Sequence, residues 1–277
     1  MKPSIPTAVT TGSLYPLPTL QSIQKLRELG LQDIELTLQS NEFTLTFERK
    51  LSMPILPELL ALVQAGELRV GSVHAPLMDA ERCYNLWARL QFLIHSIETC
   101  CLLAGRLVVI HPVHIFRTHE DALEYLAGDC TVLRSALLPG INDVLNLAHS
   151  SDIKLALENI QDWQDEIFFN TPQNVLHFLR DMNHSSLGVT LDLMHAQFPG
   201  LLDEFVQTLS ELIVNIHAAD LLPPTKRVAI GHGVIDWNSL VPKLQALPNL
   251  HQITVELSNP QPGELTESIE LLSALTS

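Results

Sequence analysis

Short apolar segments alternate with amphipathic segments along almost the whole chain of 277 residues, and this alternation constrains the fold more than any other feature. In the amphipathic segment 18–30, leucine or isoleucine recurs every three residues from Leu20 to Leu29, and Gly30 supplies a helix stop. The segment 107–111 is of the apolar type and has the length of a buried strand. Strands that alternate with helices in this way predict a parallel sheet.

Eight segments have the pattern of strands, and most of them are followed by a predicted helix. The predicted strands are 5–14, 33–38, 69–74, 107–111, 153–158, 187–192, 212–217 and 252–256. The predicted helices are 18–30, 57–65, 81–104, 120–149, a segment that begins at Thr171-Pro172, 200–209, 237–247 and 263–275. Pro139-Gly140 is expected to break or reshape the helix 120–149, and the Pro- and Gly-rich segment 218–235 is predicted as a long loop.

Eight strand–helix units in roughly 250 residues fit a closed (β/α)8 barrel, the TIM barrel. No linker or shift of composition divides the chain, so residues 1–277 are predicted to form a single domain. A doubly wound open sheet is the alternative for such a sequence. No G-x-G-x-x-G follows the first predicted strand, and the closed barrel is therefore favoured.

The composition is that of a globular protein. Apolar residues make up 46% of the chain, which is ample for a core, and no apolar run has the length that spans a bilayer. The N-terminal segment lacks the layout of a signal peptide, so a cytoplasmic location without a membrane partner is expected. The cysteines form no C-x-x-C pair, which predicts reduced, buried thiols at Cys83, Cys100, Cys101 and Cys130.

The charge balance weighs against nucleic acid as a partner. The net charge is −15, from 16 Lys plus Arg against 31 Asp plus Glu, and no Lys/Arg cluster offsets it locally. A phosphate backbone would be repelled by such a surface. Nucleic acid is therefore not expected as the main partner, and homo-oligomerisation is left open.

Six of the predicted strands end in a histidine or a carboxylate. These residues are His74, His111, Glu158, Asp192, His217 and Glu256. In a parallel barrel the carboxyl ends of all strands meet at one mouth, where imidazoles and carboxylates crowd stably around a divalent cation. A mixed His and Asp/Glu shell without thiolate suits zinc, manganese, iron or cobalt, and a carboxylate-rich shell with one His favours manganese or magnesium.

The strand-end motifs, taken in order, resemble those of the xylose isomerase-like TIM-barrel superfamily, which holds sugar isomerases and epimerases as well as the endonuclease IV type of DNA repair enzyme. The motifs are Ser72-Val73-His74-Ala75-Pro76, Val109-Ile110-His111-Pro112, Leu157-Glu158-Asn159, Asp192-Leu193-Met194-His195, Ile216-His217-Ala218-Ala219-Asp220, Gly231-His232-Gly233-Val234-Ile235-Asp236-Trp237 and Val255-Glu256. The resemblance covers nearly the whole chain.

The epimerase branch of this superfamily implies one metal ion held by Glu158, Asp192, His217 and Glu256. Glu158 and Glu256 would also be the catalytic pair that transfers a proton on opposite faces of the substrate, through a metal-stabilised enediolate. The substrate contacts that this branch implies are Glu35, His195, Lys226 and Arg227, with Trp163 and Phe168 as walls of the pocket.

The endonuclease branch implies three zinc ions. His74, His111 and Glu158 match the ligands of one zinc, and the four residues of the epimerase site match the second. The third needs His195 and an Asp-Arg-His motif, where this chain has Thr225-Lys226-Arg227. The third site is therefore not expected, whereas a second site at His74 and His111 remains open.

The leading hypothesis is a divalent-metal-dependent isomerase or epimerase of a sugar, sugar phosphate or polyol. An endonuclease IV-like phosphodiesterase and a metal-binding barrel without catalysis are the alternatives. Each of the following residues also has an alternative role without chemistry. His74 and His111 could line the pocket, His195 could be a solvated residue at a helix start, Glu35 could be a surface carboxylate, and Trp163 could be a packing residue.

Overall fold

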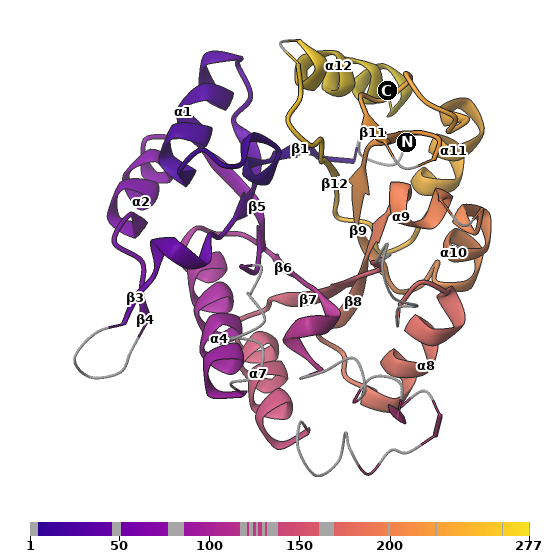
Figure 1. Ribbon diagram of the computed structural model, residues 1–277. Helices are drawn as coiled ribbons and strands as arrows, with labels where there is room; N and C mark the ends of the chain where they lie inside the picture. Colours follow the sequence, from indigo (N-terminus) through magenta and orange to yellow (C-terminus); the bar gives the residue numbers. More distant parts are fainter. Residues whose placement is uncertain are drawn as a thin grey trace.

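The computed structural model describes residues 5–45, 51–76, 86–116, 138–160, 169–198, 200–224, 226–261 and 263–276, with isolated positions between 117 and 137. Eight parallel strands close into a barrel in the order β1-β12-β9-β8-β7-β6-β5-β2 (Figure 1). They are β1 (Thr7–Thr10), β2 (Asp33–Thr37), β5 (Arg69–His74), β6 (Leu107–Ile110), β7 (Lys154–Glu158), β8 (Leu187–Asp192), β9 (Ile213–Ala218) and β12 (Gln252–Val255). The predicted (β/α)8 barrel is thereby confirmed.

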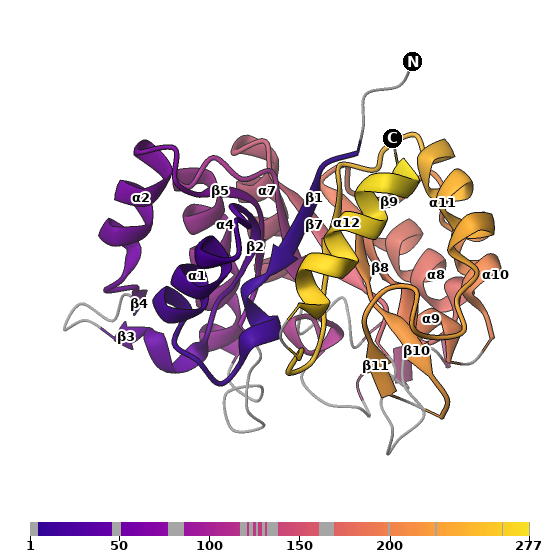
Figure 2. The same ribbon diagram turned by 90° about the horizontal axis from the view of Figure 1, so that it is seen from above.

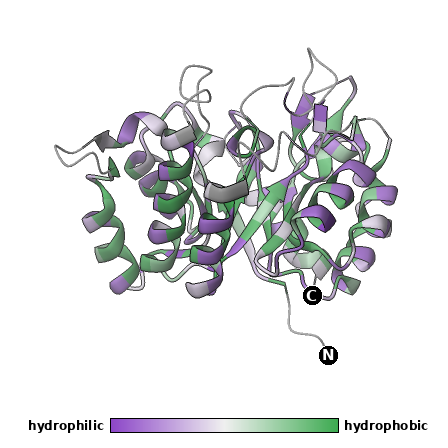
Figure 3. Ribbon diagram, turned by 90° about the horizontal axis from the view of Figure 1, so that it is seen from below, coloured by the Kyte–Doolittle hydropathy of each residue, from purple (hydrophilic) through white to green (hydrophobic). Residues whose placement is uncertain are grey.

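Helices surround this barrel (Figure 1). They are α1 (Thr19–Glu28), α2 (Leu56–Gln64), α4 (Leu86–Leu102), α7 (Leu138–Ser150), α8 (Pro172–Met182), α9 (Leu193–Gln197), α10 (Leu202–Thr208), α11 (Trp237–Ala246) and α12 (Glu264–Thr276). Figure 3 shows mostly hydrophobic residues along the strands and a mixture of hydrophobic and hydrophilic residues along the helices. Within the described residues, no helix combines the length and the apolar character that crossing a membrane requires.

The predicted first strand is too long. β1 ends at Thr10, and a 3-10 helix, η1 (Thr11–Leu14), follows it. The side chain of Thr10 accepts a hydrogen bond from the backbone N–H of Gly12 at 3.2 Å. Such local hydrogen bonds between a hydroxyl and the backbone compete with the hydrogen bonds between strands. The apolar character of the segment therefore predicted a strand longer than the one that forms.

The helix starts show how proline and threonine act locally. Thr171 caps α8, since its hydroxyl accepts the N–H of Asn174 at 3.3 Å, as the Thr-Pro pair predicts. Pro139 lies in the first turn of α7, where a proline removes no helical hydrogen bond. It therefore stands at the beginning of the described helix, and most of the predicted part before it lies outside the described residues.

The segment 218–235 is not the plain loop that its composition predicts. It forms an antiparallel hairpin of β10 (Asp220–Leu222) and β11 (Lys226–Val228), at the end of the barrel away from the chain termini (Figure 2). The buried carboxylate of Asp220 holds the connection to α11 by accepting hydrogen bonds from the backbone N–H groups of Leu221, Gly231 and Ile235 and from the indole of Trp237. Because the hydrogen bonds of Asp220 organise this segment, hydrophobic periodicity did not predict the hairpin.

Side chains alternate along each strand between the helix layer and the barrel interior. On β8, Val189 and Leu191 join the large apolar core, whereas Thr190 and Asp192, which alternate with them, are buried polar residues. A smaller, separate apolar cluster consists of Leu107, Val109, Ala156 and Val214. Because His111 and Glu158 follow Val109 and Ala156 by two positions, the strands deliver them to the interior at the carboxyl end of the barrel.

Candidate metal centre

Four strand ends bring three carboxylates and one imidazole together. They belong to Glu158 at the end of β7, Asp192 at the end of β8, His217 on β9 and Glu256 directly after β12. One ligand-type atom from each lies within 4.8 Å of the others. The side chains of the first three are at most 4% exposed, and that of Glu256 is 26% exposed. The strand-end residues predicted to converge therefore do lie together.

Asp192 is fixed by its own helix cap and by a neighbouring amide. Its Oδ1 accepts the backbone N–H of His195 at 2.8 Å and so caps α9. The side chain of Asn159 accepts the N–H of Asp192 at 2.7 Å and donates to its carbonyl at 3.1 Å. Sequence reasoning gave Asn159 no role, although its place directly after Glu158 is the signal that it lies at the same mouth.

His217 lies at the centre of this group. Its Nδ1 is 3.3 Å from Glu158 Oε1 and 3.2 Å from Glu256 Oε2. Neither of its ring nitrogens makes a directed hydrogen bond within the part of the chain that the structure describes. A buried, unbonded Nδ1 that faces two carboxylates is placed as a metal ligand would be, and the donor set fits a divalent cation.

The charges of the centre act strongly on one another. Burial alone would lower the pKa of His217, but the carboxylates of Glu35, Glu158 and Glu256 outweigh it and raise that pKa well above 6.5. Burial would raise the pKa of Glu158, yet His217 and His111 hold it well below 4.5. Burial would also raise the pKa of Glu256, but Arg227 and His217 hold it well below 4.5. Both glutamates are therefore ionised at neutral pH.

Arg227 on β11 reaches into the centre. Its Nη2 donates to Asp192 Oδ2 at 2.7 Å, and its Nη1 donates to Glu256 Oε2 at 2.5 Å and to the Glu256 carbonyl at 3.1 Å. Its side chain is only 11% exposed. The residue predicted as a substrate contact is thus the cation that balances two candidate ligands in this structure. Its neighbour Lys226 is exposed on the same hairpin.

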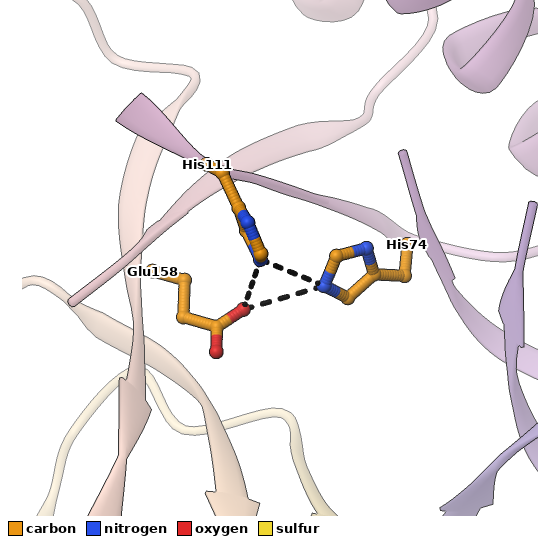
Figure 4. A group of neighbouring side chains, drawn as sticks. All are labelled: His74, His111 and Glu158. Carbon is orange, nitrogen blue, oxygen red and sulfur yellow. Dashed lines mark hydrogen bonds and ion pairs between the residues drawn. The ribbon is translucent and has the colours of Figure 1, made fainter. Parts of the chain in front are cut away.

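A second group shares Glu158 with the first. Figure 4 shows the side chains of His74, His111 and Glu158 pointing toward one another. The two Nε2 atoms are 3.1 Å apart and lie 3.3 Å (His74) and 3.0 Å (His111) from Glu158 Oε2. The Nδ1 of His74 lies 2.8 Å from the carbonyl of Ala75, which can only accept, so Nδ1 carries a proton and Nε2 offers a lone pair when the ring is neutral. With both imidazoles neutral, the three converging atoms fit a second cation.

His114 holds the two loops that carry these histidines. Its Nδ1 accepts the backbone N–H of His111 at 2.9 Å, and its Nε2 lies 3.1 Å from the carbonyl of Pro76. Burial lowers the pKa of His114 to about 3, so the ring is neutral and its Nε2 donates. The loop after β5 is thereby tied to the loop after β6, a role that sequence reasoning did not assign.

The remaining predicted residues differ in placement. The side chain of His195 is 14% exposed, with Nε2 3.9 Å from Asp192 Oδ2, so a solvated helix-start residue is the wrong description. Glu35 does not stand at a strand end: it lies in the middle of β2 and is completely buried, so it is no surface carboxylate. Trp163 and Phe168 lie outside the described residues.

A parallel (β/α)8 barrel with a carboxylate–imidazole centre at the carboxyl ends of its strands defines the class of this protein. The family model described as "Xylose isomerase-like TIM barrel" matches residues 23–275. The chain belongs to this family, as its strand-end motifs indicate.

Three known proteins are similar to this chain in sequence or in fold. An uncharacterized protein of Methanocaldococcus jannaschii is 25% identical over 262 residues, which cover 91% of this chain and 83% of that protein. A D-tagatose 3-epimerase-like protein matches with a TM-score of 0.75 and 21% identity, covering 98% of this chain and 97% of that one. An AP endonuclease of family 2 from Brucella melitensis matches with a TM-score of 0.73 and 13% identity, covering 98% of both chains. At these identities the two structures show the shared fold alone.

The raised pKa of His217 gives a prediction for metal binding. In the metal-free protein its ring is protonated at pH 7, since its pKa lies well above 6.5, and a cation that uses Nδ1 must expel a proton. The affinity is therefore expected to rise about tenfold per pH unit from pH 6.5 until the pH passes the raised pKa. Isothermal titration at pH 7 in two buffers of different ionisation enthalpy is expected to show release of at least one proton per ion. Binding without proton release would contradict it.

Proposed function

We propose that the protein is a divalent-metal-dependent isomerase or epimerase that acts on a sugar, a sugar phosphate or a polyol. The observation that carries the proposal is the convergence of Glu158 and Glu256, both ionised, with Asp192 and His217 at one barrel mouth. Epimerisation and aldose–ketose isomerisation both need a base and an acid beside a carbon next to a carbonyl. The family and the fold of the epimerase-like neighbour support this choice.

Glu158, Asp192, His217 and Glu256 would hold the metal ion, for which manganese and zinc suit the donors best and magnesium, cobalt or iron are alternatives. Bound there, a divalent ion supplies Lewis acidity that stabilises negative charge developing on the substrate oxygens. Asn159 and the cap of α9 keep Asp192 in place for this task. The second group, His74 and His111 with Glu158, would hold a further ion.

The proton transfers would fall to the two glutamates. One carboxylate would accept the proton from the substrate carbon and later release it to solvent, and the other would take up a proton from solvent and return that proton to the product carbon. Glu256, which is the more exposed of the pair, is the one that bulk solvent can reach. His195 and the basic residues Lys226 and Arg227 would bind substrate hydroxyls or a phosphate, with Trp163 as a wall.

The test is a panel of aldoses, ketoses, their phosphates and polyols, assayed with the protein loaded with manganese or zinc. We expect an epimer or an isomer of at least one compound, and we expect Glu256→Gln to lose this turnover. A Glu256→Gln variant that keeps both metal binding and turnover would contradict the proposal. A cytoplasmic location and a small-molecule carbohydrate partner are part of the same proposal.

The second candidate is an endonuclease IV-like phosphodiesterase, which the group of His74, His111 and Glu158 favours because a shared carboxylate suits a pair of cations. Metal-dependent cleavage of an abasic oligonucleotide, without turnover of any sugar, would support it over the isomerase. Bound metal with silence in both assays would support a barrel without catalysis.

A further inference from the structure

We infer that Glu35 is a positioning residue that holds the imidazole of His217 so that its Nδ1 faces the metal site. The inference rests on the metal centre proposed above and adds Glu35 as a residue that contacts one of its ligands. Glu35 lies on β2, on the opposite side of the His217 ring from Glu158 and Glu256. Its Oε1 is 3.0 Å from Nε2 of His217, whereas the other two carboxylates lie near Nδ1.

The contact joins two side chains without exposed surface. Both Glu35 and His217 have a side-chain exposure of 0%. An imidazole that binds a metal ion through one nitrogen carries its proton on the other, and a carboxylate at that second nitrogen fixes the orientation of the ring. Here Glu35 Oε1 and His217 Nε2 lie within hydrogen-bond distance, but their relative orientation is not that of a hydrogen bond. Neither atom has a hydrogen-bond partner among the described residues. The Nε2 edge of the ring thus faces a buried carboxylate oxygen at 3.0 Å, which leaves Nδ1 on the side of the metal site.

The other oxygen of Glu35 is tied down from two strands. Its Oε2 accepts hydrogen bonds from Ser72 Oγ on β5 at 2.8 Å and from Asn215 Nδ2 on β9 at 3.3 Å. Ser72 Oγ in turn accepts from Gln252 Nε2 on β12 at 2.8 Å. These bonds anchor the carboxylate inside the barrel, so Glu35 acts on His217 from below and is not free to swing toward a substrate.

A purely structural role is the competing explanation, because Glu35 belongs to a buried polar network in any case. The two roles differ in what a substitution changes. Loss of a network bond lowers the stability of the metal-free protein wherever it occurs. Loss of the contact with His217 also weakens metal binding and alters the geometry around the ion.

The experiment compares Glu35→Gln with Gln252→Met in the full-length protein. The glutamine keeps the size of Glu35 and removes the charge that faces Nε2. Gln252→Met is the matched control: it removes two buried hydrogen bonds, to Ser72 and Thr254, from a residue whose hydrogen bonds lead to Glu35 through Ser72 on one side and through Thr254 and Asn215 on the other. The probe is Co²⁺, whose absorption spectrum reports the ligand geometry and whose titration gives the dissociation constant.

We expect Glu35→Gln to weaken Co²⁺ binding by about 10- to 100-fold and to change the spectrum. Gln252→Met is expected to keep the wild-type spectrum and an affinity within about twofold, although both variants melt at a lower temperature than the wild type. Ser72→Ala keeps the carboxylate of Glu35 and removes one of its hydrogen bonds. Its affinity for Co²⁺ is expected to lie between those of Glu35→Gln and Gln252→Met. This variant replaces Glu35→Gln in the comparison if Glu35→Gln does not fold.

The outcomes separate this inference from the proposed function. Wild-type protein that binds no Co²⁺ would overturn the metal centre itself. Wild-type protein that binds Co²⁺, together with a Glu35→Gln variant of equal affinity and unchanged spectrum, would overturn only the role of Glu35. Equal weakening by Gln252→Met would also overturn it, because the effect would then belong to the network as a whole.

Discussion

Replacing Glu158 by glutamine is expected to lower turnover by on the order of 10²–10⁴ and to weaken metal binding by on the order of a hundredfold or more. The amide cannot take up a proton, and it presents one acceptor oxygen where the carboxylate presents two. Both oxygens of Glu158 face cationic or ligand-type groups: Oε1 lies near His217, and Oε2 lies near His74 and His111. The measurements are the rate of isomer or epimer formation and the metal dissociation constant.

The control for this substitution is Asp203→Asn. Asp203, on α10, is an exposed carboxylate that pairs with Lys243 at 2.6 Å and belongs to neither group of candidate ligands. A surface pair of this kind contributes little, so metal affinity and turnover are expected to match the wild type. If Glu158→Gln bound metal as tightly as Asp203→Asn, Glu158 would not be a ligand.

Arg227→Ala is expected to destabilise the metal-free protein by on the order of 3–5 kcal/mol. The guanidinium bridges Asp192 and Glu256, and its removal leaves two mostly buried carboxylates without their nearest cation. A bound divalent ion replaces this lost charge. The rise in melting temperature on adding metal is therefore expected to be larger in the variant than in the wild type, as thermal unfolding with and without the ion would show.

Lys226→Ala is the matched control, since Lys226 lies next to Arg227 on the same hairpin and is exposed. Its stability and its metal-induced shift are expected to equal those of the wild type. An Arg227→Ala variant that behaves like Lys226→Ala would mean that Arg227 does not balance the site carboxylates.

The barrel and the strand-end residues were predictable for one physical reason. Parallel strands that alternate with helices place their carboxyl ends at one mouth, so a polar residue at each strand end implies convergence. Asp192 shows this clearly, because it follows the apolar run 187–191 and also begins a helix. The six residues from His74 to Glu256 could therefore be placed near one another without knowledge of the loops.

The partners of those residues depend on tertiary contacts that local pattern does not contain. Glu35 stands between Ile34 and Leu36, and alternation alone does not say which face of a strand is the barrel interior. Arg227 reaches the centre from a hairpin that is organised by the carboxylate of Asp220, which has no periodic signal. His114 binds backbone atoms of two different loops, so its role appears only when those loops are in place.

The most direct test of the central claim is hydrogen exchange in deuterium oxide. The metal-loaded protein would be incubated with each sugar, sugar phosphate and polyol of the panel, and the products analysed by NMR. We expect metal-dependent incorporation of deuterium at a carbon next to the carbonyl of at least one compound, and we expect this incorporation to be lost in Glu158→Gln and in the chelated protein. Deuterium incorporation that persists in Glu158→Gln, or its absence from every compound with metal bound, would contradict the account.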